Sequence, residues 1–151
     1  MNLIELLRHQ NITFKETHFE RDFFTVAEVA EYLNIDSAQI GKAMVIQDGG
    51  KNLIVLLISG SKRLDLDTTR HKLNDSKLKL VHSSKIETMI GLPVGAVTPL
   101  IKMINKEIRI IIDQKLMEFP FINISSGQNK IGIDINPMDL AKVTCATIFS
   151  F

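Results

Sequence analysis

The chain has 151 residues, of which 45% are apolar, and its formal net charge is +1. A chain of this length is expected to fold as one domain over residues 1–151, and its charge argues against the strongly basic class of nucleic-acid-binding domain. No apolar run approaches the roughly 20 residues of a membrane-spanning helix, and Glu5 interrupts the first apolar stretch, unlike a secretory signal. The sequence therefore predicts a cytoplasmic protein with no membrane partner.

Apolar periodicity and capping residues define the elements expected in the first half of the chain. Thr25 and Glu28 have capping-box spacing, which predicts the start of a helix that ends near Asn34. The run Leu53–Ile58 is apolar at every position and predicts a central strand covered on both faces. In chain order we expect a helix over Asn2–His9, a strand over Ile12–Lys15, a helix over Thr25–Asn34, strands over Lys42–Gln47 and Leu53–Ser59 joined by a glycine turn over Asp48–Lys51, and a helix over Asp65–Leu73.

The second half is expected to be rich in strands. Ser84 and Glu87 have capping-box spacing, and Asn136 with Pro137 is typical of a helix start. In chain order we expect a strand over Lys79–His82, a helix over Ser84–Ile90, strands over Ile108–Asp113, Phe121–Ser125 and Lys130–Ile135, a short helix from Asn136, and a strand over Val143–Phe149. Because strands and helices mix without a regular βαβ alternation, the predicted fold class is α/β: a single domain with a mixed, strongly curved β-sheet surrounded by short helices.

Lys42 opens an apolar strand, where period-two alternation places it on the side of Met44 and Ile46. An ammonium there either extends into solvent at the strand end or lies at the floor of a cleft. An ordinary lysine is protonated at neutral pH. In a cleft it would therefore hold a substrate and stabilise negative charge before it would act as a base.

Two loops carry small residues between apolar elements. The Gly91–Pro99 loop holds two glycines and two prolines, so Gly95 could expose its N–H in an oxyanion cradle to which Thr98 adds a hydroxyl. The alternative is a plain connector. Ser125–Gly127 lies between two strand patterns and is equally compatible with a hairpin turn.

The sequence predicts neither a metal site nor a cofactor. The four histidines are scattered and have no ligand-type spacing. The single cysteine, Cys145, lies in the apolar run Val143–Ile148 and is expected to behave as a small buried hydrophobe.

Lys42 and the two loops occur in the order and at about the separation found in the YbaK/prolyl-tRNA editing domain family, which the chain resembles from about Thr17 to Val143. The resemblance implies a YbaK-like fold and the activity of a freestanding aminoacyl-tRNA deacylase. Such an enzyme hydrolyses the ester that joins a small misattached amino acid to tRNA, in trans, with the prolyl-tRNA class as the expected substrate. The implied partners are a mischarged tRNA and an aminoacyl-tRNA synthetase.

The resemblance also implies roles for individual residues. The expected catalytic residues are Lys42, Gly95 and Thr98, and the expected substrate-binding residues are Ala96, Val97, Pro99, Ser126 and Gly127. Seven basic residues stand against three aspartates between Lys62 and Lys85. That segment is either an ordinary solvated surface or a contact for the tRNA backbone.

One departure from the family pattern keeps other functions open. Family members commonly place a glycine two residues after the proline, where this chain has Leu100-Ile101. If either side chain projects into the cleft, it narrows the pocket; otherwise both lie in the core. The alternative function is a catalytically inactive binding module that uses the same cleft for an aminoacylated RNA end, a nucleotide or a partner protein. A small-molecule hydrolase with no RNA substrate is a third possibility, which the near-zero net charge favours.

Overall fold

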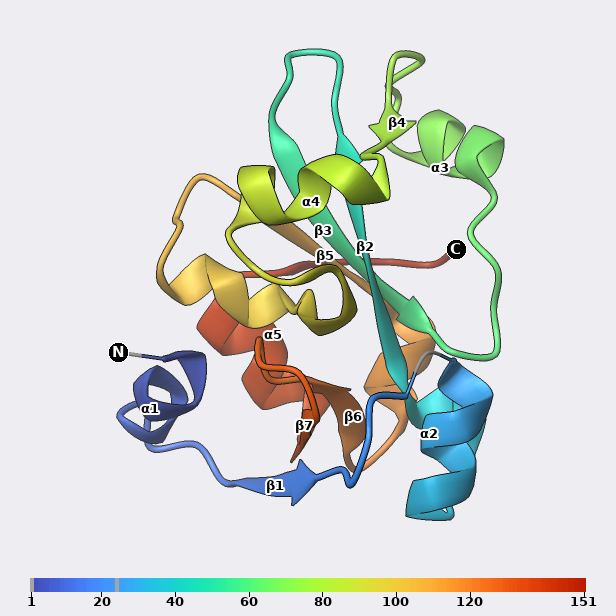
Figure 1. The fold of residues 1–151 in the computed structure, drawn as a ribbon. Coiled ribbons are helices and arrows are strands. Elements are labelled where there is room, and N and C mark those ends of the chain that lie inside the picture. The colour runs from blue at the N-terminus through green and yellow to red at the C-terminus, as the bar shows by residue number, and fades with distance from the viewer. Residues whose placement is uncertain (1, 24) are drawn as a thin grey trace.

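A computed structural model describes residues 2–23 and 25–151 and contains two β-sheets (Figure 1). The first is a mixed sheet of five strands in the order β4-β2-β3-β5-β8, and the second is an antiparallel sheet of three strands in the order β1-β7-β6. The strands are β1 (Phe14–His18), β2 (Gly41–Gln47), β3 (Leu53–Ser59), β4 (Lys79–Leu80), β5 (Arg109–Asp113), β6 (Ile122–Ser125), β7 (Ile131–Ile135) and β8 (Thr147–Phe149).

Short helices surround these sheets (Figure 1). The α-helices are α1 (Leu3–Arg8), α2 (Val26–Leu33), α3 (Leu66–Lys72), α4 (Ser83–Ile90) and α5 (Pro137–Thr144), and the 3₁₀ helices are η1 (Ser37–Gln39), η2 (Val94–Ala96), η3 (Pro99–Met103) and η4 (Gln114–Glu118). In the large sheet β2 is antiparallel to β3, whereas β3, β5 and β8 are parallel. The predicted α/β class with a mixed sheet and short helices is confirmed, and its strong curvature stays a prediction.

Strand β3 is the centre of the large sheet and is covered on both faces, as its unbroken apolar run predicts. Val55 and Leu57 belong to the larger core cluster, and Ile54, Leu56 and Ile58 belong to a smaller cluster on the other face. These five side chains are at most 2% exposed. Full burial of each stabilises the fold by about 1.5 to 3 kcal/mol, before conformational entropy is subtracted.

Local signals fix most helix starts. The Thr25 hydroxyl accepts the N–H of Glu28 at 3.1 Å. The Asn136 side chain accepts the N–H groups of Met138 and Asp139, and Pro137 is the first residue of the helix. Both predicted N-caps are therefore confirmed. The cap predicted at Ser84 is wrong, because the ring of His82 accepts the N–H of Ser84 at 3.1 Å and α4 starts at Ser83.

Several boundaries differ from the sequence prediction: the strand predicted over Ile12–Lys15 lies at Phe14–His18, and the one predicted over Lys79–His82 ends at Leu80. Helix α5 continues to Thr144 and Cys145 adopts left-handed geometry (φ 51°), so the last strand starts at Thr147 and not at Val143. Leu140 and Thr144 are fully buried one helical turn apart, which favours helix over strand there. Cys145 is exposed at this helix end, so its expected burial is also wrong.

The turn between β2 and β3 lies over the predicted residues, but Lys51 adopts the positive φ (66°) while the two glycines do not. The side chain of Asp48 organises this turn. It accepts the N–H of Asn52 at 2.8 Å and that of Gly50 at 2.9 Å. The bond from Asn52 is the main reason that the pKa of Asp48 lies below its ordinary value.

The two sheets meet at the start of β2. Ile40 forms a parallel bridge with Asn123 in β6. A Cβ atom at Gly41 would lie 3.0 Å from the Ile124 side chain, so the glycine allows the two backbones to approach. This junction places the first residues of β2 beside the end of β6.

Candidate active site

A cleft lies at the junction of the two sheets and consists of two adjoining hollows. One, the asparagine hollow, has a volume of about 390 Å³ and includes Asn123 and Asn129; the other, the lysine hollow, has a volume of about 520 Å³ and includes Lys42. The walls that both hollows share are formed by Phe23, Val29, Ile40, Gly41, Val94 and Gly95. Four chain segments, within 19–29, 40–43, 93–97 and 123–132, therefore meet in one cleft.

Lys42 is half-buried at the second position of β2 and lines the lysine hollow. Its ammonium donates a hydrogen bond to the backbone carbonyl of Lys62 at 3.1 Å. Met44 and Ile46, on the same side of the strand, contact the smaller core cluster. The Lys42 ammonium therefore has a hydrogen-bond partner in the turn that follows β3.

The Gly95 loop and the start of β2 line the same two hollows. Gly95 is exposed and lines both hollows. A Cβ atom added at Gly95 would meet only Asn129, with 3.7 Å to its Oδ1 atom, so the glycine leaves free space on the cleft side. Val97 lines the lysine hollow, whereas Ala96 is fully buried and does not line either hollow.

Thr98 and Pro99 do not line either hollow. Both are buried, and Thr98 is the N-cap of η3, where its hydroxyl accepts the N–H of Leu100 at 3.4 Å. In this arrangement Thr98 stabilises the start of η3. The contact of both residues with substrate stays a prediction, without support from the cleft walls.

The second loop presents different residues from those that the sequence indicates. Ser126 is fully buried and bonds to the backbone of Gln128, and Gly127 faces α1, where a Cβ atom would lie 2.8 Å from Leu3. Neither lines the hollows, whereas Ser125 and Gln128 line the asparagine hollow. The sequence does carry a signal for these cleft residues. Side chains alternate between the two faces of β6, and its polar residues, Asn123 and Ser125, lie on one face of an otherwise apolar strand.

An aromatic wall, which sequence reasoning missed, lies beside the cleft: Phe19 and Phe23 line the hollows, and Tyr32 packs against both rings without lining either hollow. The ring of Phe19 lies edge-on to those of Phe23 and Tyr32, with centroid distances of 5.1 and 5.3 Å. The guanidinium of Arg21 lies 4.7 Å from the centroid of Phe23. Such pairs and cation–π contacts each stabilise by about 0.5 to 1.5 kcal/mol beyond area burial, so the wall is held together by its own contacts.

Leu100 and Ile101 do not narrow the pocket. They are 0% and 1% exposed and belong to the larger core cluster. Leu100 and Ile101 lie in η3 and are buried, whereas the preceding loop, with Val94 and Gly95, lines the cleft. The expectation that either side chain reduces the cleft volume is therefore wrong, and the core alternative is confirmed.

The described residues, 2–23 and 25–151, contain no group of three or more His, Cys, Asp or Glu side chains placed to hold a metal ion. Within the same residues, no helix has the length and apolar character required to cross a membrane.

Comparison with known proteins identifies the family. The aminoacyl-tRNA editing domain model matches residues 20–143. EbsC of Enterococcus faecalis, a proposed Cys-tRNA(Pro)/Cys-tRNA(Cys) deacylase, is 22% identical over 145 residues, covering 95% of this chain and 87% of EbsC. A proline-tRNA ligase of Acidithiobacillus ferrooxidans is 30% identical over 105 residues, which are 70% of this chain and 18% of the ligase. The crystal structure of hypothetical protein APE2540 shares the fold, with a TM-score of 0.88 and 21% identity over 98% of this chain and 97% of that one. The chain belongs to the aminoacyl-tRNA editing domain family.

Proposed function

We propose that the protein is a cytoplasmic aminoacyl-tRNA deacylase that hydrolyses, in trans, the ester between a small misattached amino acid and a tRNA of the prolyl class. The observation that carries this proposal is the presence of Lys42 and Gly95 in the lining of the same hollow. A cation and an unobstructed backbone amide are the groups that stabilise the oxyanion formed when an ester carbonyl is attacked.

In the proposed reaction, water attacks the ester carbonyl while the terminal ribose remains in the cleft. The lysine ammonium holds the ribose or the carbonyl oxygen, and the Gly95 amide offers a second donor. We assign the group that assists the water to a hydroxyl of the substrate's own ribose. Among the described residues that line the cleft there is no histidine or cysteine, and the one carboxylate is that of Asp22, in the asparagine hollow. The protein's share of catalysis is therefore positioning and charge stabilisation.

The apolar walls favour a small amino-acid side chain. Val29, Ile40 and Ile124 line the asparagine hollow together with the uncharged polar groups of β6. A synthetase separates near-isosteric small side chains by only about 1 to 3 kcal/mol, so a second site that hydrolyses the wrong product improves fidelity. The similarity to EbsC and to a proline-tRNA ligase supports tRNA(Pro) as the carrier and a synthetase as a partner.

The test is release of a labelled amino acid from a panel of tRNAs charged with alanine, cysteine, serine or proline. We expect release of at least one small non-cognate amino acid from tRNA(Pro), and little release of proline. Tight binding of the panel with no release above the uncatalysed rate would instead identify the chain as a binding module. Hydrolysis of simple amino-acid esters at the same rate as of charged tRNA would identify a small-molecule hydrolase.

The basic segment provides a separate test of RNA binding. Of its cations, Lys62 and Arg70 pair with aspartates inside the chain, whereas Lys77 and Lys79 are exposed. Strand β4, which contains Lys79, pairs with Ile46–Gln47, about 15 Å along β2 from Lys42 at roughly 3.3 Å per residue. An acceptor stem whose end lies in the cleft could reach this edge.

Reversing both charges, with Lys77→Glu and Lys79→Glu, is expected to raise KM for charged tRNA more than it lowers kcat, and to weaken the salt dependence of binding, because fewer counterions are released. Lys106→Glu with Lys142→Glu changes the net charge equally at exposed sites outside the segment and is the matched control. An equal rise in KM for both double variants would remove the segment from the RNA contact.

Gly95 offers a second local test. Gly95→Ala should place a methyl group in the cleft without strain, since its only neighbour within 4 Å would be Asn129. We expect an unchanged melting temperature and a loss of about tenfold or more in deacylation, because a small displacement of the ester is costly. Gly91→Ala is the control for the effect of a glycine-to-alanine change on stability. At the Gly91 φ of 84° alanine is unfavourable by about 1 to 2 kcal/mol, but no atom beyond the adjacent residues lies within 4 Å of the added methyl group. The activity of this variant per folded molecule should stay at the wild-type value.

A further inference from the structure

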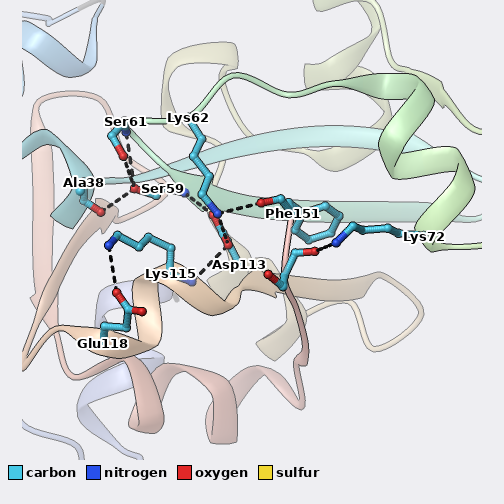
Figure 2. Close-up of polar contacts among 10 residues, drawn as sticks. Ala38, Ser59, Ser61, Lys62, Lys72, Asp113, Lys115, Glu118 and Phe151 are labelled. Carbon is cyan, nitrogen blue, oxygen red and sulfur yellow. Dashed lines mark hydrogen bonds and ion pairs between the residues drawn. The ribbon is translucent and has the colours of Figure 1, made fainter.

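A buried carboxylate lies at the end of β5, outside the cleft. The side chain of Asp113 has no exposed surface, and its Oδ1 atom lies 3.0 Å from the Lys62 ammonium (Figure 2). The same oxygen accepts the N–H of Lys115 at 3.1 Å, and Oδ2 accepts the N–H of Ser59 at 3.2 Å. A buried charge is costly unless it is paired and hydrogen-bonded, and here both oxygens have donors.

Lys62 connects this carboxylate to the cleft. Its ammonium, which also donates to the carbonyl of Phe151 at 2.9 Å, is held at Asp113 (Figure 2). Its own backbone carbonyl accepts the hydrogen bond from Lys42. A single residue therefore has its side chain anchored in the protein interior and its carbonyl in contact with the proposed catalytic ammonium.

The turn that carries Lys62 is fixed at both ends. Asp113 binds Ser59 through its N–H and Lys62 through its ammonium. The Ser59 hydroxyl donates to the carbonyl of Ala38 at 2.8 Å, and the N–H of Gly60 donates to that of Ile40 at 2.7 Å. The turn is thus hydrogen-bonded to the segment that leads into β2. That segment includes Ile40, which lines the cleft.

We propose that Asp113 and Lys62 form a positioning pair, which fixes the Lys62 carbonyl and through it the ammonium of Lys42. Among the described residues, that carbonyl is the one hydrogen-bond partner of the Lys42 ammonium. A lysine side chain has four rotatable bonds, so an ammonium without a fixed acceptor would sample many positions. This inference rests on the proposed function only for the role of Lys42 in ester hydrolysis. The effect of the Asp113–Lys62 pair on the order of the Lys42 side chain can be measured whether or not the protein is a deacylase.

The kinetic test uses Asp113→Asn, which keeps the shape of the side chain, and Lys62→Met, which keeps the backbone carbonyl. We expect kcat to fall by about 10- to 100-fold, since displacements near 1 Å have effects of that size. KM should change less than about twofold, because the cleft walls are retained. Lys62→Arg retains a cation opposite Asp113 and should recover most of kcat.

Lys115→Met is the matched control. The Lys115 ammonium pairs with Glu118 at 3.0 Å on the surface, and only the backbone N–H of Lys115 touches Asp113 (Figure 2). This variant removes a neighbouring cation and leaves the pair intact, so kcat should not change. A fall equal to that of Lys62→Met would overturn the proposal, because it would show a general effect of positive charge.

The second measurement is the ¹⁵N order parameter of the Lys42 ammonium, assigned by its loss in Lys42→Arg. We expect a lower order parameter in Lys62→Met and Asp113→Asn than in the wild type and Lys115→Met, at temperatures where all are folded. If Asp113→Asn does not fold, Lys62→Met decides the question, because that side chain is 31% exposed and less of the interior depends on it. An unchanged order parameter overturns the positioning pair. A wild-type protein without deacylase activity overturns the proposed function alone.

Discussion

Lys42→Ala is expected to lower kcat for amino-acid release by about 100- to 1,000-fold, the loss seen when one oxyanion-stabilising donor is removed from an enzyme. The fold should survive, because Lys42 is half-buried near a strand end and, among the described residues, its side chain makes one hydrogen bond, to the carbonyl of Lys62. Such a bond contributes about 0.5 to 1.5 kcal/mol net. Single-turnover release from mischarged tRNA, together with thermal melting, measures both effects.

Lys42→Arg should also be impaired, because a planar guanidinium cannot occupy the position of a compact ammonium against one carbonyl. The control is Lys102→Ala. The Lys102 ammonium likewise donates to backbone carbonyls, those of Lys106 at 2.7 Å and Ile108 at 2.9 Å, but it lies outside the cleft. Equal losses of activity per folded molecule in both alanine variants, or full activity in Lys42→Ala, would remove Lys42 from the catalytic site.

The parts of the fold that could be predicted depend on signals within a few residues. The apolar run of β3, the Thr25 cap and the Asn136-Pro137 start each have one strongly favoured local structure, and the protein adopts it. The sequence prediction for the end of α5 is wrong because Val143 opens an apolar run, Val143–Ile148, that is typical of a strand. Burial of Leu140 and Thr144 one turn apart, which is a tertiary effect, decides the outcome.

The candidate site is harder to predict, because its walls depend on the direction of each side chain. Adjacent residues of a strand or tight loop face opposite ways, so an error of one position exchanges Ser125, which lines the cleft, for Ser126, which is buried. The aromatic wall formed by Phe19, Phe23 and Tyr32 has no spacing motif, since its geometry depends on how α2 packs beside the small sheet. Lys42 and Gly95 line the cleft, and a charge or an absent side chain makes each unusual in its sequence context; their catalytic roles, which come from the family resemblance, stay predictions.

Leu100→Ala and Ile101→Ala are expected to destabilise the fold by about 2 to 5 kcal/mol each, the usual cost of truncating a buried aliphatic side chain. Both side chains lie in the larger core cluster and are almost fully buried. For a chain of this length, that loss corresponds to a fall of roughly 5 to 15 °C in melting temperature. Ile104→Ala, at the end of the same 3₁₀ helix, is the control, because Ile104 is 57% exposed and should tolerate truncation.

The amino-acid profile of these variants separates a core role from a pocket role. Because neither Leu100 nor Ile101 lines the cleft, truncation should leave the ratio of release rates for alanine, cysteine and serine unchanged at a temperature where the variants are folded. If these side chains formed a pocket wall, truncation would instead raise the relative release rate of larger amino acids, by up to about 100-fold for one or two methylene groups. A broadened profile without a lower melting temperature would place these side chains in the pocket after all. An unchanged profile with a lower melting temperature means that the departure from the family glycine strengthens the core and leaves substrate choice to the cleft walls.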